Sequence, residues 1–238
     1  MPFSEAELQH LIARLAVGAD QRLFSVMDWE AQLGGDPAAK EFARQLRLEW
    51  QPAIPPDDFC REMVDFVRDH LHMHDHGPHI WAHTLRVTGN AMSMAHEANV
   101  EPQLAFLLAL FHDVGKLDEI IRNETHEAIG AEIARHKLSG IFSRSMVTLI
   151  SNVIGKDASR ANPFTRLLHD ADKLDKIGAA GIARRFSAGR SVGHTEFALR
   201  RLRSELISFR PMYFPFAQVM AEMKKQFTRE FLASLHED

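Results

Sequence analysis

The stretch LAFLLALFHDVGKLDE, residues 104–119, decides the fold of this chain. Residues 104–111 are apolar on every side of a helix, and this pattern predicts a helix that is buried throughout. The helix leads directly into His112 and Asp113, and Gly115 is typical of a helix end. A carboxylate at a buried helix C-terminus needs a positive partner, because the helix carbonyls already carry partial negative charge. That partner is either a metal ion or a lysine or arginine, and this stretch alone leaves both open.

Helical spacing of apolar residues extends over most of the chain. It predicts further helices within 54–71 and over 79–98, 102–113, 124–138, 141–154, 163–176 and 215–235. No segment alternates in the manner of a strand, so we expect an all-α fold. The proline-rich segment QPAIPPDD, residues 51–58, predicts a boundary between an N-terminal helical extension (1–57) and the main domain (58–238).

Composition excludes several classes of protein. With 238 residues, a net charge of −4 and a pI near 6.4, the chain has no overall field that attracts nucleic acid polymers or membranes. The single cysteine, Cys60, is expected to be a packed residue in a protein from a reducing compartment. There is no secretory signal pattern, and the longest apolar run is far shorter than the ~20 residues that span a bilayer. We therefore expect a soluble cytoplasmic protein.

Two other segments place polar residues among apolar ones. His83 shares a helix face with Val87 and Ala91, and Asp172 lies in a predicted helix beside Ala171 and Leu174. If the two histidines and two aspartates of these helices meet, they form a donor set of intermediate hardness. Such a set suits Mn²⁺, Fe²⁺, Co²⁺, Ni²⁺ or Zn²⁺ better than Ca²⁺, and Mg²⁺ stays possible.

The order His83, then His112–Asp113, then Asp172 resembles the signature of the HD-domain metal-dependent phosphohydrolases. The flanking words match as well: HTLRV from residue 83, HDVGK from residue 112 and DADKLDKIGAAGIAR from residue 170. Together with the closing segment FTREFLASL, they are similar to the small stand-alone bacterial HD hydrolases. The resemblance covers residues 58–236 and implies an HD-domain helical bundle. It leaves the N-terminal extension unexplained.

The resemblance implies that His83, His112, Asp113 and Asp172 bind the metal. Asp172 is preferred over Asp170 because the family's ligand follows an alanine and precedes a basic residue and a leucine. Asp170 and Asp175 are then expected either to orient a ligand or to lie at the surface.

The resemblance also suggests roles for three basic residues, each with a simpler alternative. Lys116, with Asp113, is a candidate catalytic residue that offsets charge on a phosphate, or else an exposed lysine in a salt bridge. His126 matches a histidine that serves a second metal or phosphate in some branches, or is a surface histidine. Arg184 lies in a possible phosphate-binding stretch, or is a solvated arginine.

One departure from the family pattern bears on the number of metals. Members with two metals carry a further histidine after the position of His126, and the segment VTLISNVIGKDAS, residues 147–159, contains none. We therefore favour one divalent metal. The same absence disfavours a two-metal cyclic nucleotide or dinucleotide phosphodiesterase and a two-iron oxygenase.

These observations predict a metal-dependent phosphohydrolase that acts on a small phosphomonoester or nucleotide with a metal-activated water as nucleophile. The alternatives are a regulatory HD module that binds a nucleotide without turnover, and a cyclic (di)nucleotide phosphodiesterase. The run HLHMHDHGPHIWAH, residues 70–83, contains six histidines, of which only His83 is expected to be a ligand. The four from His70 to His76 are expected to be exposed and to bind nickel or zinc adventitiously.

Overall fold

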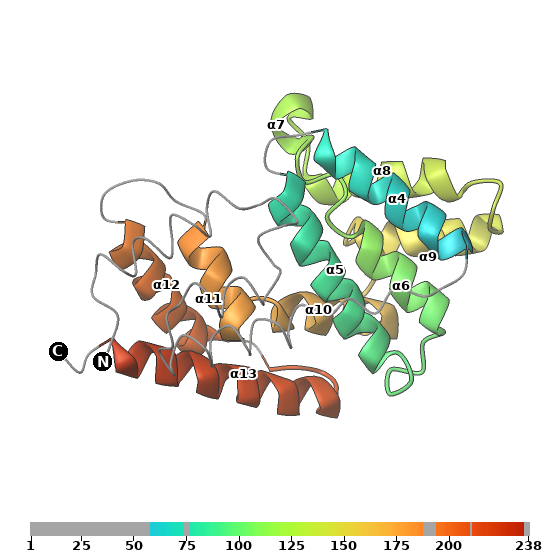
Figure 1. The fold of residues 1–238 in the computed structure, drawn as a ribbon. Coiled ribbons are helices and arrows are strands. Elements are labelled where there is room, and N and C mark those ends of the chain that lie inside the picture. The colour runs from blue at the N-terminus through green and yellow to red at the C-terminus, as the bar shows by residue number, and fades with distance from the viewer. Residues whose placement is uncertain (1–57, 74–76, 188–193, 210, 236–238) are drawn as a thin grey trace. The chain divides into compact units, whose positions relative to one another are not determined.

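The described part of the chain is built from helices joined by loops. A computed structural model describes residues 58–73, 77–187, 194–209 and 211–235 (Figure 1). Within these ranges there is no strand, only an isolated bridge between Ser139 and Phe142, so the predicted all-α fold is confirmed. The extension predicted for residues 1–57 lies outside the described residues, and its boundary stays a prediction. None of the described helices is both long and apolar enough to cross a membrane.

The described residues fall into two compact units. Residues 58–172 and 213–217 form the first unit, and it contains all four predicted metal ligands. Residues 173–212 and 218–235 fall in the second unit. The helices of the first unit are α4 (Asp58–His72), α5 (Gly77–Met94), α6 (Pro102–Phe111), α7 (Glu119–Arg122), α8 (His126–Leu138), α9 (Arg144–Ile154) and α10 (Pro163–Leu174), whose last residues pass into the second unit.

Helix α6 is the centre of the first unit. It contacts α4, α5 and α9, and every residue from Leu104 to Phe111 is buried, as the sequence predicts. Its start is well defined, because Pro102 occupies the first turn and Glu101 Oε2 accepts a hydrogen bond from the Leu104 N–H at 3.0 Å. Burial on all sides fixes the position of α6, and therefore of the two residues that follow it.

The loop after α6 is held close to the start of α8. A Cβ atom built on Gly115 would lie 2.7 Å from both the backbone N of Gly130 and the backbone O of His126. Only glycine permits this approach, because those neighbours are backbone atoms that cannot turn away. The close packing brings the loop that carries Asp113 and Lys116 alongside the first turns of α8.

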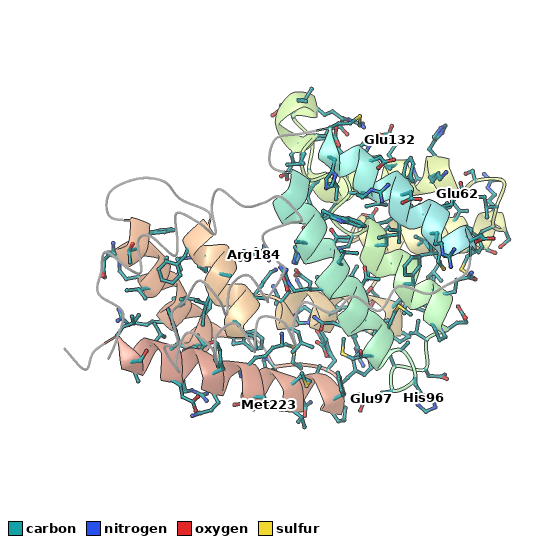
Figure 2. All side chains as sticks on the ribbon, in the orientation of Figure 1. Glu62, His96, Glu97, Glu132, Arg184 and Met223 are labelled. Carbon is teal, nitrogen blue, oxygen red and sulfur yellow. The ribbon has the colours of Figure 1, made fainter. Side chains whose placement is uncertain are left out.

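Charged pairs lie on the outside of the first unit. Figure 2 shows Glu62 on α4 and Glu132 on α8, both mostly exposed. Glu62 accepts a hydrogen bond from Lys137 at 2.8 Å, and Glu132 accepts one from Arg122 at 2.6 Å. Such exposed pairs contribute little to stability.

The second unit contains α11 (Gly178–Ser187), α12 (His194–Ser208) and most of α13 (Pro215–Ser234), whose first residues belong to the first unit. Its core includes Ala179, Phe186, Leu202 and Leu232. Helices α11 and α12 were not predicted from the sequence. In α11 most of the buried residues are alanine or glycine, with Ile182 and Phe186 beside them.

Candidate metal centre

Three helices bring the predicted ligands together in the first unit. His83 comes from the middle of α5, His112 is the C-cap residue of α6, and Asp113 follows it. One ligand atom from each of these three residues lies within 4.8 Å of the others. Asp172, in the last turn of α10, places its Oδ1 3.5 Å from His83 Nε2.

The distances among the donor atoms suit a single cation. His83 Nε2 lies 3.2 Å from His112 Nε2, and Asp113 Oδ2 lies 3.6 Å from the former and 3.7 Å from the latter. Donors bound at 2.0–2.2 Å to one metal are expected about 3.0–3.5 Å apart, depending on the geometry. The observed separations match this spacing with a small expansion. The residues therefore fit a divalent metal in both donor type and spacing.

The tautomer of His112 is also the one that a metal requires. Its Nδ1 lies 2.6 Å from the Ala109 carbonyl oxygen and donates a hydrogen bond to it, which leaves the lone pair on Nε2. Burial lowers the pKa of His112, and the nearby Asp113 only partly opposes this shift. The ring is therefore held neutral, with its free nitrogen directed toward His83.

Asp113 is held in its ionised form. Burial acts to raise the pKa of its carboxyl, but His112, His83 and Lys116 together outweigh burial and hold the pKa below its ordinary value. An ionised carboxylate between two imidazoles leaves negative charge that a cation can neutralise. The charge of Asp113 and the spacing of the donor atoms therefore both favour a bound cation.

A second group of donors lies beside the first. Glu119, His126 and Glu127 also each offer a ligand atom within 4.8 Å of the others. His126 Nε2 lies 3.5 Å from Asp113 Oδ1, and Lys116 Nζ lies 3.3 Å from His126 Nδ1. The structure thus brings Lys116 and His126, both candidate substrate-binding residues, next to the predicted ligand Asp113.

Sequence reasoning missed Glu119 and Glu127. Glu127 follows His126 directly, and Thr125 caps α8 by accepting a hydrogen bond from the Ala128 N–H. The helix start therefore presents the side chains of residues 126 and 127 together, and the sequence NETHEAIG, residues 123–130, contains this signal. Glu119 shows no comparable signal, because its contact with His126 depends on the loop between α7 and α8.

Asp170 is fully buried, which excludes the surface position considered for it. Its Oδ2 accepts hydrogen bonds from the N–H groups of Tyr213 (2.7 Å) and Phe214 (3.0 Å), just before α13, and its Oδ1 lies 3.0 Å from His169 Nδ1. Asp170 therefore ties α10, which carries Asp172, to the start of α13.

Asp175 and Arg184 lie in the second unit. Asp175 is fully buried, so a surface position is wrong for it too. Its Oδ2 lies 3.6 Å from Arg184 Nη1, and Arg184, labelled in Figure 2, is partly exposed. Arg184 is therefore in an ion pair within its own unit, and its role toward a substrate stays a prediction.

One expectation about the histidine run is wrong. His70 is only 19% exposed, its Nε2 lies 2.9 Å from Asp118 Oδ2, and its ring stacks against Phe66. It faces the loop after α6 because it lies in the last turn of α4, which packs against α6. His72 is exposed as expected, and His74 and His76 lie outside the described residues.

The fold and the site define an all-α protein with a buried histidine–aspartate group suited to a divalent metal. The family model of the HD domain matches residues 80–179. A solved structure from an uncultured Thermotogales bacterium, described as a predicted HD superfamily hydrolase, is 30% identical and has a TM-score of 0.57. The match covers 74% of this chain and 90% of that one. The chain therefore belongs to the HD superfamily of hydrolases.

Two further solved structures share the fold. An HD-superfamily hydrolase from Bacillus thuringiensis is 24% identical, with a TM-score of 0.59 over 74% of this chain and 93% of that chain. Bacillus subtilis YpgQ, solved in complex with ADP, is 23% identical, with a TM-score of 0.53 over 75% of this chain and 96% of that chain. The search of curated proteins found no match.

Proposed function

We propose that this chain is a metal-dependent phosphohydrolase whose substrate is a small phosphomonoester or a nucleotide. The observation that carries the proposal is the ligand spacing among His83, His112 and Asp113, together with Asp172 Oδ1 at 3.5 Å from His83 Nε2. One divalent ion, of the Mn²⁺, Fe²⁺, Co²⁺, Ni²⁺, Zn²⁺ or Mg²⁺ type, is the expected cofactor. When bound, such an ion acidifies a water molecule and polarises a phosphoryl oxygen.

The residues around this group have complementary tasks. Asp113 and Asp172 would hold the cation, and one of them would also guide the proton of the water molecule. Lys116 lies three residues beyond Asp113 with a side chain that is 35% exposed, so its ammonium can reach a phosphate oxygen. His126 lies 3.5 Å from Asp113 Oδ1 and 3.3 Å from Lys116 Nζ, and it is a second contact for the phosphate. Arg184 is also proposed to contact the substrate, and this part of the proposal rests only on its positive charge.

The ADP complex of YpgQ supports a nucleotide as the substrate class. That relative shares the fold of this chain, so the support is by analogy. A net charge of −4 offers no general attraction for a nucleic acid polymer, which favours a small substrate.

The test is hydrolysis of a panel of nucleotides and aryl phosphate mono- and diesters by the purified full chain. Each substrate is assayed with Mn²⁺, Co²⁺, Ni²⁺, Mg²⁺ or chelator, using wild type, Asp113→Ala and Asp65→Ala. Asp65 is an exposed aspartate of α4 that pairs with Arg68, which makes it a matched control. We expect metal-dependent phosphate release in wild type and Asp65→Ala, and none in Asp113→Ala.

Two results would contradict the proposal. Nucleotide binding without turnover under any metal would indicate a regulatory module. Turnover restricted to cyclic nucleotides or dinucleotides would indicate a phosphodiesterase.

A further inference from the structure

One face of α4 contacts both ends of the loop that follows α6. The Phe66 ring stacks on Phe111, the last residue of α6, with the ring centroids 6.0 Å apart. One turn further along α4, His70 Nε2 lies 2.9 Å from Oδ2 of Asp118, the N-cap residue of α7. Residues four positions apart share a helix face, so the two rings of α4 point to the same side. Residues 112–117 are therefore held between two contacts with a single helix.

The contact between His70 and Asp118 has a defined geometry. A carboxylate oxygen accepts and cannot donate, so His70 Nε2 carries the proton of this hydrogen bond. The His70 ring also stacks on Phe66, with the planes 29° apart, and this stacking fixes the orientation of the imidazole. The side chains of the pair are 19% and 20% exposed, so water still reaches them. Such a pair adds little to the stability of a whole domain, and its main effect is on the position of the loop.

Asp118 closes a series of turns that begins at the predicted ligand Asp113. The Lys116 N–H donates to the Asp113 carbonyl at 2.9 Å, and the Asp118 N–H donates to the Gly115 carbonyl at 3.2 Å. Gly115 packs tightly against α8, and this packing supports the Asp113 side of the loop independently of Asp118. Lys116 lies between Gly115 and Asp118, so the position of its backbone depends on both supports.

The residue that follows Asp118 contacts both proposed phosphate-binding side chains. Glu119 Oε1 accepts a hydrogen bond from His126 Nδ1 at 2.8 Å, and Glu119 Oε2 lies 3.9 Å from Lys116 Nζ. Lys116 Nζ itself lies 3.3 Å from His126 Nδ1. A shift of Asp118 would move the adjoining backbone of Lys116 and Glu119 together. It would therefore disturb the alignment of Lys116 with His126.

We propose that His70 is a positioning residue, which acts through Asp118 to hold the loop so that Lys116 and His126 stay aligned for a phosphate group. The inference deepens the proposed function and rests on it for the phosphate. It gives one histidine of the run a task that involves no metal, in contrast to the adventitious metal binding expected from the sequence.

The test is the dissociation constant of inorganic phosphate for the Mn²⁺-loaded full chain, measured by phosphorus NMR relaxation. His70→Leu keeps an apolar contact with Phe66 but removes the donor, and it should weaken phosphate binding about 3- to 10-fold, the effect of one lost hydrogen bond. His70→Gln places an N–H donor near the position of the imidazole Nε2 and should restore most of the affinity. The Mn²⁺ dissociation constant, measured by electron paramagnetic resonance, should stay at the wild-type value in both variants.

A double-mutant cycle tests whether His70 acts through Asp118. Asp118→Ala should weaken phosphate binding as much as His70→Leu, and the double variant should bind no more weakly than either single variant. His72→Leu is the matched control, since His72 is an exposed histidine of the same helix, and it should bind phosphate as wild type does. Thermal melts identify a variant that fails to fold, and Asp118→Ala then tests the same contact. A lower melting temperature with unchanged phosphate affinity, or fully additive losses, would overturn the inference.

Hydrogen exchange in the metal-free protein separates this inference from the proposed function. We expect the amides of Lys116 and Asp118 to exchange faster in His70→Leu than in wild type and His70→Gln, because the turns that they close lose a support. If wild type bound neither Mn²⁺ nor phosphate, the proposed function would fail, and faster exchange in His70→Leu would still support the hold of His70 on the loop. Exchange equal to that of wild type would overturn it.

Discussion

The Nε2 atoms of His83 and His112 lie 3.2 Å apart, although the residues belong to different helices and are 29 positions apart in the chain. His112 donates from Nδ1 to the Ala109 carbonyl, so its Nε2 presents a lone pair to His83. Two buried imidazoles in this relationship are compatible only if a proton or a cation lies between them. Because a bound cation would satisfy both imidazoles, this contact predicts that metal binding stabilises the folded protein.

Addition of Mn²⁺ should stabilise the protein. Binding to the folded state at a free concentration 100 times the dissociation constant adds about 2.7 kcal/mol, which raises Tm by about 5–10 °C for a chain of this size. Differential scanning calorimetry with Mn²⁺ and with chelator measures the shift. The Asp113→Asn variant should show less than half of this increase in Tm. An increase equal to that of wild type would place the metal elsewhere.

The metal-free protein should lose stability as the pH falls below 6.5, the ordinary pKa of histidine. Burial lowers the pKa of His112, so the unfolded chain binds a proton there that the folded chain does not. The free energy of unfolding therefore falls with decreasing pH, by up to about 1.4 kcal/mol per pH unit until the folded pKa is reached. Urea unfolding in chelator at pH 7.5, 6.5 and 5.5 measures this slope. His112→Gln should be less pH-dependent than wild type, and identical slopes would contradict the explanation.

Gly115→Ala should destabilise the protein, because the added Cβ would lie 2.7 Å from two backbone atoms of α8. We expect a loss of about 1–3 kcal/mol, as for other overpacked positions. Gly130→Ala is the matched control, since its Cβ would meet the Ile154 side chain at 3.3 Å and that side chain can adjust. Urea denaturation midpoints compare the two variants. A loss for Gly115→Ala no larger than for Gly130→Ala would argue against close packing of the loop.

Asp170→Ala should cost about 2–4 kcal/mol, because two backbone N–H groups at the start of α13 lose their acceptor in a buried place. Glu97 is a useful comparison, since its exposed carboxylate accepts one hydrogen bond, from Phe216 N–H at 3.1 Å. Glu97→Ala should cost less than about 1 kcal/mol. Chemical denaturation measures both losses. If the two variants lost similar amounts of unfolding free energy, burial of Asp170 would not make its hydrogen bonds more stabilising than the exposed one of Glu97.

Local patterns in the sequence determined the helical elements and the chemistry of the predicted ligands. The apolar run 104–111 predicts a buried helix because a helix without a polar face has no side to present to water. The ordered histidines and aspartates indicate the family because each is recognised by its immediate neighbours in the chain. Helices α11 and α12 escaped this reading. Helix α11 buries mostly alanine and glycine beside Ile182 and Phe186, and the described part of α12 buries only Ala198 and Leu202.

Only the tertiary structure decided which distant side chains meet. Sequence patterns did not reveal that Asp113 faces both His83 and His126, that Glu119 orients His126, or that Lys116 lies beside the His126 ring. They also suggested exposure for His70, whose ring instead lies 2.9 Å from Asp118. The physical reason is that helix formation depends on residues three or four positions apart, whereas these contacts depend on how separate helices and loops pack together.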